Sequence, residues 1–411
     1  MAQNIDNEQL RTLVNSRLDE LNSDLHEINK AIHSNPELCY QEFFAHETLT
    51  NYLEKLGFEV KRKAYGLDTA FEVSIGKGGR QVVVCCEYDA LPQIGHGCGH
   101  NLIATSSLGA FLGAAHAISE LGIPGRLRIL GTPAEEGGGG KARLIKAGAF
   151  HHTEDIAASI MCHLVSTHMI NRGKTDYDGM AGYEMIASNK FRVEFRGATA
   201  HAAGEPWNGV NALDAAVAAY NNVSLLRQQI RPEERVHGVI EDGGTVPNVI
   251  PDYTRMNWYV RSPTSEQADK LEKRVKACIE AAAAATGCEF NYIPTDAYMN
   301  IVINDSLCKA YVEDMEKLGQ KVIQRATEPF TASTDMGNVT HIVPGFHGAF
   351  GLQADTSVAL HSRGFAAAAG RDDSHEIAMK SAKGMAMLAL RVITDEAIAK
   401  AAREDFEARY G

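Results

Sequence analysis

Residues 81–101 read QVVVCCEYDALPQIGHGCGHN: an apolar run, a polar turn and a glycine-rich loop. Residues 81–86 are rich in valine and have the length of a strand that is buried on both faces. Similar strand-like runs at 71–75, 127–131 and 156–162 alternate with helix-like runs at 9–32, 47–56, 101–121 and 142–147. This alternation predicts an α/β fold, with a mostly parallel sheet and helices on both of its faces.

The loop after this strand carries the side chains of a possible ligand site. Glu87 and Asp89 follow the strand, and Cys98 and His100 come just before the next helix-like run. Ligands bind at the carboxyl ends of strands in open α/β sheets, and thiolate and imidazole are good ligands for borderline metals such as zinc. Cys-Gly-His alone would be typical of an ordinary glycine-rich connection. Together with Asp89 and the residues described next, it indicates a metal site.

The pair Glu135-Glu136 is a second signal, because it follows a strand-like run and precedes four glycines, Gly137–Gly140. Adjacent carboxylates repel each other unless a cation lies between them or one keeps a proton. Exposed Glu-Glu pairs are common and usually carry no function, but here the glycines suit a close approach of the backbone. A phosphate-binding loop is the alternative interpretation. The Gly-Lys-Ser/Thr ending of such a loop is missing, and carboxylates precede the glycines.

Three histidines are candidates for the same site. His163 follows an apolar strand-like run, so we expect it at the same edge of the sheet as Glu87 and Glu135. A single histidine in such a place is more often a core residue with a satisfied hydrogen bond, and His361 has the same status. We prefer His361 to His375, because His375 is expected to open the last helix, where a capping or surface role is the simpler explanation.

The pattern of the chain changes near Ser188. Residues 190–196 and 253–261 alternate apolar with polar or charged side chains, as strands with one exposed face do. Further strand-like runs (236–241, 288–293) and helix-like runs (211–227, 265–285) complete the order β-α-β-β-α-β. We therefore predict that residues 188–297 form an inserted ferredoxin-like domain. Residues 1–187 and 298–411 are predicted to form the catalytic, metal-binding domain.

Composition and charge narrow the class of protein. The 411 residues are too many for one compact core, so two domains are expected. A net charge of −12 without a Lys/Arg cluster argues against nucleic acid or an anionic membrane as a partner. We see no signal peptide and no apolar run of about 18 residues, so no membrane span is expected. Eight scattered cysteines fit reduced thiols, and with them a cytoplasmic protein, better than a disulfide framework.

Five motifs carry a resemblance to a known family. They are EYDALPQIGHGCGHN (87–101), GTPAEEGGGG (131–140), FRGATAHAAGEPWNGVNALDA (195–215), VPNVIPD (246–252) and ALHSRGF (359–365). In this combination and order, over nearly the whole chain, they resemble the aminoacylase and dipeptidase metallopeptidases. The branch is that of the aminobenzoyl-glutamate hydrolases and the plant indoleacetyl-amino-acid hydrolases. Within it, the motifs most resemble those of the β-alanyl-lysine dipeptidase-like members.

The resemblance implies two divalent metal ions in the larger domain, with zinc as the first choice and manganese as the alternative. Carried over to this sequence, the ligands would be Cys98, His100, Glu136, His163 and His361. Asp89 would orient one of these ligands, as carboxylates near metal sites do. Many members have His-x-Asp at the end of this strand. Here Glu87 stands in place of that histidine, and His100 can supply the lost imidazole.

The resemblance also implies catalytic roles. Glu135 would be the general base, taking a proton from the metal-bound water and returning it to the departing amine. His201, on the inserted lid domain, would stabilise the oxyanion, acting either within its own chain or on the partner subunit of a homodimer. Asn248 would bind the substrate carboxylate or the oxyanion.

We therefore expect a metal-dependent amidohydrolase that cleaves dipeptides or N-acyl-amino acids, with a lid that closes over a small substrate. One alternative is a metal-free thiol hydrolase in which Cys98 is the nucleophile and His100 its base. The other is a binding protein that has kept the fold and lost the chemistry.

Overall fold

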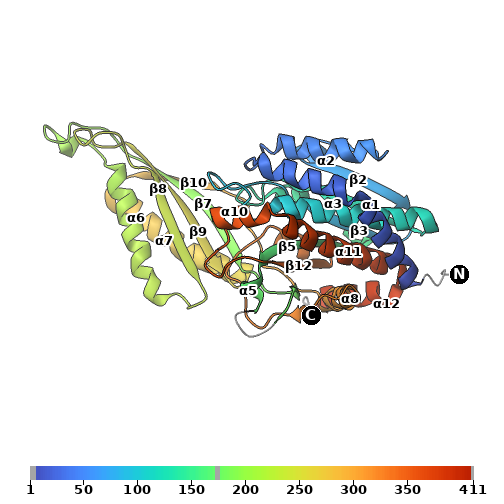
Figure 1. Cartoon of the computed structure of the whole chain (residues 1–411). Coiled ribbons are helices and arrows are strands. Elements are labelled where there is room, and N and C mark those ends of the chain that lie inside the picture. Colours follow the sequence, from blue (N-terminus) through green and yellow to red (C-terminus); the bar gives the residue numbers. More distant parts are fainter. Residues whose placement is uncertain (1–5, 172–175, 409–411) are drawn as a thin grey trace. The chain divides into compact units, whose positions relative to one another are not determined.

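The computed structural model describes residues 6–171 and 176–408, and the chain divides into two compact units (Figure 1). Unit 1 comprises Met1–Glu184, Ile301–Pro329 and Asn338–Gly411, and unit 2 comprises Met185–Asn300 and Phe330–Gly337. The inserted segment predicted from the sequence is residues 188–297. In the structure, the short segment Phe330–Gly337 also belongs to unit 2.

Unit 1 is built on an eight-stranded sheet in the order β1-β2-β4-β3-β5-β12-β6-β11. Its strands are β1 (Lys61–Arg62), β2 (Phe71–Lys77), β3 (Gln81–Cys86), β4 (Gly125–Gly131), β5 (Ile156–Ser166), β6 (Gly179–Gly182), β11 (Val322–Arg325) and β12 (Gly345–Leu352). The central strands β4, β3, β5 and β12 are parallel to one another, and β6 is antiparallel to β12. The predicted α/β fold with a mostly parallel sheet is confirmed.

Both faces of this sheet are covered in its centre. Every residue of β12 and all but the first of β3 are buried. Since neighbouring side chains of a strand point to opposite faces, such strands must be covered on both sides. The helices that flank the sheet are α1 (Asn7–Ser34), α2 (Phe43–Lys55), α3 (His100–Leu121), α4 (Gly140–Lys146), α5 (Thr167–Asn171), α8 (Asp305–Lys317), α10 (Arg363–Ala369), α11 (Asp372–Thr394) and α12 (Glu396–Glu407). Short elements are η1 (Ala64–Gly66), η2 (Thr153–Asp155) and α9 (Met336–Thr340).

Helix α3 is the central helix of unit 1 and lies beside α1 and α11 (Figure 1). Two glycines allow this close packing: a Cβ on Gly109 would lie 3.1 Å from the Ala382 side chain, and one on Gly113 would lie 3.2 Å from Val14. In length and composition α3 could cross a membrane, but most of its apolar stretch is buried inside the protein. It therefore has the environment of a core helix.

Three predictions about local structure are wrong. Helix α2 begins at Phe43, four residues before the predicted start at residue 47. Strand β5 runs on to Ser166, so His163 lies within the strand and not after its end. His375 does not open the last helix: it lies in the first turn of α11, which α12 follows, and its side chain is buried rather than on the surface. In β5 the buried residues Leu164 and Val165 continue the apolar run beyond His163, and element boundaries carry the weakest sequence signal.

Unit 2 has the predicted order β-α-β-β-α-β. Its elements are β7 (Ala187–Arg196), η3 (Pro206–Asn208), α6 (Ala212–Leu226), η4 (Arg227–Gln229), β8 (Arg235–Asp242), β9 (Tyr253–Ser262), α7 (Ser265–Thr286) and β10 (Glu289–Pro294). The sheet is antiparallel throughout, in the order β10-β7-β9-β8, and α6 and α7 pack side by side on it (Figure 1). Alternate residues of β7 and β9 form the core with these helices, so only one face of the sheet is sealed.

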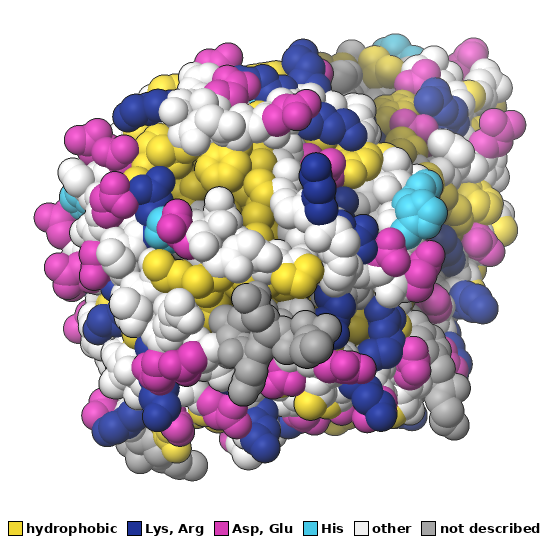
Figure 2. Space-filling model, turned by 90° about the vertical axis from the view of Figure 1, so that its right-hand side faces the viewer, with side chains coloured by type: hydrophobic (Ala, Val, Ile, Leu, Met, Phe, Trp, Pro, Cys, Tyr) yellow, Lys and Arg dark blue, Asp and Glu magenta, His cyan; other side chains and the backbone are white. Residues whose placement is uncertain are grey.

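Charged side chains of both signs are interspersed on the face of the molecule shown in Figure 2. Acidic residues outnumber basic ones in the sequence, 52 against 40. On this face the acidic and basic side chains are intermixed and do not form one field of a single sign.

Candidate metal centre

The loop after β3 brings Cys98 and His100 to the end of the sheet because Gly99 lies between them. Gly99 has φ +74°, and a Cβ at this position would lie 2.1 Å from the Leu164 side chain. Only glycine accepts both this backbone conformation and this contact. The spacing Cys-Gly-His therefore places a thiol and an imidazole at the start of α3, against β5.

The loop after β4 carries Glu135 and Glu136. Its backbone is strained at one residue and is held in place by a hydrogen bond to a buried carboxylate. Ala134 has φ +61°, and the buried carboxylate of Glu42 accepts a hydrogen bond from its N–H (2.9 Å). A Cβ on Gly140 would lie 1.7 Å from the Pro133 carbonyl oxygen, so the glycines let the loop fold back on itself. The prediction that they serve a close approach of the backbone is confirmed here. Backbone strain of this kind is typical of ligand and active sites.

The side chains of the two loops, of β5 and of the segment before α10 meet in three overlapping groups. The groups are Cys98–His100–His163, Cys98–Glu136–His361 and Glu87–His100–Glu135. Within each group one donor atom from every residue lies within 4.8 Å of the others. The structure thus brings all five predicted ligands and the predicted base together. Cys98 and His361 share one of these groups although they are 263 positions apart (361 − 98).

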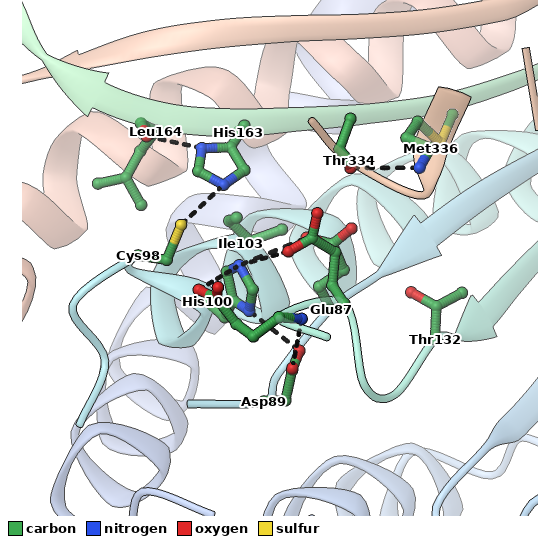
Figure 3. A network of polar contacts seen from close by, with 12 residues as sticks. Glu87, Asp89, Cys98, His100, Ile103, Thr132, His163, Leu164, Thr334 and Met336 are labelled. Atoms are coloured by element: carbon green, nitrogen blue, oxygen red, sulfur yellow. Dashed lines mark hydrogen bonds and ion pairs between the residues drawn. The ribbon is translucent and has the colours of Figure 1, made fainter. Parts of the chain in front are cut away.

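Asp89 orients His100 at this centre (Figure 3). Its Oδ1 lies 3.1 Å from Nδ1 of His100, and its Oδ2 accepts a hydrogen bond of 2.9 Å from the backbone N–H of Glu136. Burial by itself would raise the pKa of Asp89, but these hydrogen bonds and the nearby imidazole lower it. Asp89 is therefore a carboxylate that fixes the ring of His100 and directs Nε2 towards the glutamates.

His163 is fixed in the same way by the backbone. Its Nδ1 donates to the Leu164 carbonyl oxygen (2.7 Å), and its Nε2 lies 3.4 Å from the Cys98 sulfur (Figure 3). Burial, with a contribution from His100, lowers the pKa of His163 to about 4. The neutral ring with a free Nε2 lone pair is the form that binds metals.

The two candidate histidines near the C-terminus lie in different places. His361 has φ +60°, and its N–H donates to the Gly97 carbonyl oxygen (2.9 Å), which holds it beside the Cys98 loop. Its Nε2 lies 3.6 Å from a Glu136 carboxylate oxygen. His375 instead contacts Asn22 at 3.1 Å and belongs to none of the three donor groups found among the described residues.

The residues present fit a divalent cation. Glu87 Oε2, His100 Nε2 and Glu136 Oε1 are buried, and none has a hydrogen-bond partner within the described part of the chain. An unsatisfied buried polar group costs about 1–3 kcal/mol, so three of them at one place need an explanation. His100 Nε2 lies 3.7 to 3.9 Å from carboxylate oxygens of Glu87, Glu135 and Glu136. Donor atoms that bind one ion at about 2.0–2.2 Å lie about 3–4 Å apart.

The structure adds residues that sequence reasoning did not assign. Lys141 forms an ion pair with Glu87, and both side chains are fully buried. Behind His163, the rings of His347 and His163 are 6.1 Å apart, and Nδ1 of His347 lies 2.8 Å from the Tyr183 hydroxyl. Lys141 directly follows the four glycines, which is the one sign in the sequence that it lies near the site.

His201 and Asn248 lie together in unit 2. His201 pairs with Val249 in an isolated antiparallel bridge, and the Ala202 N–H donates to the Asn248 carbonyl oxygen (3.1 Å). Both side chains are exposed. Nδ1 of His201 accepts hydrogen bonds from the N–H groups of Ala203 and Gly204 (3.2 and 3.0 Å), so the ring proton is on Nε2. His201 therefore presents an N–H donor to its surroundings.

Comparison with known proteins agrees with this geometry. The model of Peptidase family M20/M25/M40 matches residues 86–379, which includes every residue of the three donor groups. The chain is 39% identical to the Xaa-Arg dipeptidase of Mus musculus over 98% of this chain and 93% of that protein. It is 28% identical to one of the subunits of the p-aminobenzoyl-glutamate hydrolase of Escherichia coli, over 69% of this chain and 61% of that protein.

Solved structures share the fold at low sequence identity. The aminobenzoyl-glutamate utilization protein of Klebsiella pneumoniae has a TM-score of 0.70 at 18% identity, covering 92% of this chain and 98% of that one. A dinuclear metal-binding M20 peptidase of Bacillus subtilis has a TM-score of 0.63 at 20% identity, covering 91% and 99%. The predicted family is confirmed: this chain belongs to the M20/M25/M40 peptidases and is a hydrolase of peptide or amide bonds.

Proposed function

We propose that this protein is a metal-dependent dipeptidase or amidohydrolase that releases an amino acid from an acyl or aminoacyl group. The proposal is carried by one observation: three groups of possible metal donors meet around Cys98 and His100. Buried oxygen and nitrogen atoms of these groups have no hydrogen-bond partner among the described residues. Two divalent cations, when bound there, would lower the pKa of a water molecule and polarise the amide carbonyl. The donors would be Cys98, His100, Glu136, His163 and His361.

Glu135 is the proposed general base. It belongs to the same donor group as His100 and sits on the strained loop that Glu42 anchors. Its carboxylate takes one proton from the attacking water and delivers it to the amine nitrogen as the C–N bond breaks. The products are a carboxylate and a free amine, so no other reactant is needed.

His201 is the proposed oxyanion donor, and Asn248 a proposed contact for the substrate carboxylate or the same oxyanion. The tautomer of His201 supports this role, because two backbone N–H groups occupy Nδ1 and leave an N–H on Nε2. A fixed N–H donor aimed at developing negative charge is what an oxyanion site requires.

The substrate class follows from the relatives. The Xaa-Arg dipeptidase of Mus musculus and the p-aminobenzoyl-glutamate hydrolase subunit of Escherichia coli are both similar to this chain, and their names describe an amide bond to the nitrogen of an amino acid. We therefore propose dipeptides first, with a basic C-terminal residue, and N-acyl-amino acids second.

A mixed panel tests the function directly. Protein loaded with Zn²⁺ or Mn²⁺ is incubated with Xaa-Arg, Xaa-Lys and neutral dipeptides and with N-acyl-amino acids, and the released amino acids are quantified. We expect release that chelation abolishes. Activity that survives chelation but is lost on alkylation of Cys98 would identify the thiol hydrolase, and no release by any substrate would favour a binding protein.

The thiol alternative has an observation against it. In the absence of a cation, burial and the nearby Glu136 raise the pKa of the Cys98 thiol well above its usual range. A nucleophilic cysteine needs the opposite environment, one that stabilises the thiolate. A cation at the donor groups would supply that stabilisation and would also occupy the sulfur.

We also propose that the protein is a homodimer and cytoplasmic. Unit 2 supports the first part: β8 is an edge strand with exposed Val239 and Ile240, and the neighbouring helix α6 exposes Val217 and Leu225. An exposed apolar edge strand commonly pairs with another chain. Val239→Lys should therefore yield a monomer in light scattering, and an unchanged mass would contradict this interface.

The cysteines support the proposed cytoplasmic location. All eight lie in the part of the chain that the structure describes, and all are free thiols, which fits a reducing compartment.

A further inference from the structure

Glu87 and Lys141 form a buried ion pair at the edge of the proposed metal centre. Glu87 follows β3, and Lys141 lies in the first turn of α4. Lys141 Nζ pairs with Glu87 Oε1, and both side chains are 0% exposed. A buried ammonium or carboxylate costs several kcal/mol unless it is paired with good geometry. A pair buried this deeply is weak evidence for stability, so it calls for another explanation.

The second oxygen of Glu87 faces the metal ligands. Glu87 Oε2 lies 3.7 Å from Nε2 of His100, and neither atom has a hydrogen-bond partner among the residues that the structure describes. Asp89 occupies the other ring nitrogen of His100. Figure 3 shows Glu87, Asp89 and His100 close together, with Cys98 and His163 beside them. Glu87, His100 and Glu135 are also one of the three groups that could hold an ion.

We propose that Glu87 is a further donor of the metal centre, and that Lys141 is the positioning residue that holds its other oxygen. This inference rests on the proposed function. The ammonium fixes Oε1 and balances the charge of the carboxylate, so Oε2 can face a cation beside His100 without adding net charge to the site. A donor oxygen commonly depends on such a partner for its orientation.

The two metal positions would then differ chemically. One would have the sulfur of Cys98 with His163, and the other would have the carboxylate of Glu87 with His100, beside the proposed base Glu135. Thiolate favours zinc, whereas carboxylate oxygens suit harder ions such as Mn²⁺. We therefore expect the oxygen-rich position to accept Mn²⁺ more readily and to exchange its ion first.

Metal titration of the full chain tests the proposal. Wild type, Glu87→Gln, the double variant Glu87→Gln/Lys141→Met and Asp314→Asn are stripped and titrated with Mn²⁺, and free Mn²⁺ is followed by electron paramagnetic resonance. Asp314 is the matched control, because it is 2% exposed and pairs with Arg11 at 3.2 Å and Arg391 at 3.1 Å, outside the three donor groups.

Wild type and Asp314→Asn should each bind two ions, and the affinities of the variant should equal those of wild type. Both variants that lack the Glu87 carboxylate should bind the weaker of the two ions at least about tenfold less tightly. Glu87→Gln alone leaves the buried ammonium of Lys141 without its carboxylate and could therefore unfold the protein. The double variant removes this ammonium as well, so it tests the loss of the carboxylate without that cost. If wild type binds no ion, the proposed function fails. If wild type and both Glu87 variants bind two ions equally, only the present inference fails.

Lys141 is tested by the spectrum of the Co²⁺-loaded protein. Lys141→Met keeps the Glu87 carboxylate, so it should still bind two Co²⁺ ions, with altered visible absorption bands because one donor is reoriented. The Asp314→Asn control should have the wild-type spectrum. A wild-type spectrum in Lys141→Met would overturn the positioning role and leave the donor role of Glu87 to the titration.

Discussion

Unit 1 and unit 2 treat polar side chains in opposite ways. Unit 1 buries Glu87, Cys98, His100 and Glu135 of its candidate centre and exposes only His361, whereas unit 2 has an apolar core and keeps His201 and Asn248 exposed. Burying polar groups is costly unless they are satisfied. Changes to the proposed metal ligands of unit 1 should therefore affect metal binding and stability as well as turnover, and changes at the loop of unit 2 should affect turnover alone.

The largest expected effect is on turnover in Glu135→Gln. Loss of the proposed general base should lower kcat by about 10²–10⁴-fold, while metal content and melting temperature stay near wild type. Steady-state kinetics and elemental analysis of the same sample check this. Loss of metal in Glu135→Gln, together with full metal content in Cys98→Ala, would mean that the base and the ligand have been exchanged.

His201→Ala tests the same comparison with a substitution in unit 2. Removing the proposed oxyanion donor should lower kcat by about 10²-fold or more. Because the side chain is exposed, metal content and unfolding temperature should not change. His237→Ala is a control, since His237 is another exposed histidine of unit 2, on strand β8. Wild-type kinetics of His201→Ala on every amide tested would remove His201 from the mechanism.

Removing the metal should destabilise unit 1 selectively. An ion present at about 100 times its Kd stabilises a fold by about 2.7 kcal/mol. Chelation should therefore speed hydrogen exchange in residues 97–105 at the start of α3 and leave β9 of unit 2 unchanged. An equal response of both segments would contradict the assignment of the ions to unit 1.

The smallest effect concerns a buried histidine away from the centre. Burial, with the nearby His26, lowers the pKa of His375 to about 4, below its ordinary value of 6.5. The folded state therefore binds fewer protons than the unfolded state between these values, so this contribution is present above pH 6.5 and is lost as the pH falls towards 4. Stability measured by urea unfolding should depend less on pH in His375→Gln over this window. An identical pH dependence would contradict this prediction.

Much of unit 1 follows from local signals. The bounds of β3 agree with the sequence, because valine and cysteine in an unbroken run favour a buried strand. Strands β6 and β12 were not predicted, since GMAG and GFHGAFGL contain little but glycine, alanine and phenylalanine. Pairing with neighbouring strands makes them strands, and their composition does not reveal it.

The residues of the candidate centre likewise fall into those that the sequence predicts and those that only the structure reveals. The residue types and the family pattern pointed to Cys98, His100, Glu136, His163 and His361, and the structure brings them together. The sequence places Glu87 at the same strand end but does not assign it as a ligand, because nothing near it in the sequence indicates a partner. Lys141 lies 54 positions further along the chain, and a lysine after four glycines gives no sign that it is buried.

By itself, the sequence determined the alternation of strands and helices, the inserted β-α-β-β-α-β unit and the types of side chain at the strand ends. These depend on periodicity and on motifs that are continuous in the chain. Only the tertiary structure decided which nitrogen of each histidine faces the centre, which buried oxygens lack a partner and which lysine balances Glu87. Such properties depend on distances between segments that pack together from far apart in the chain, and burial makes each unpaired atom costly enough to matter.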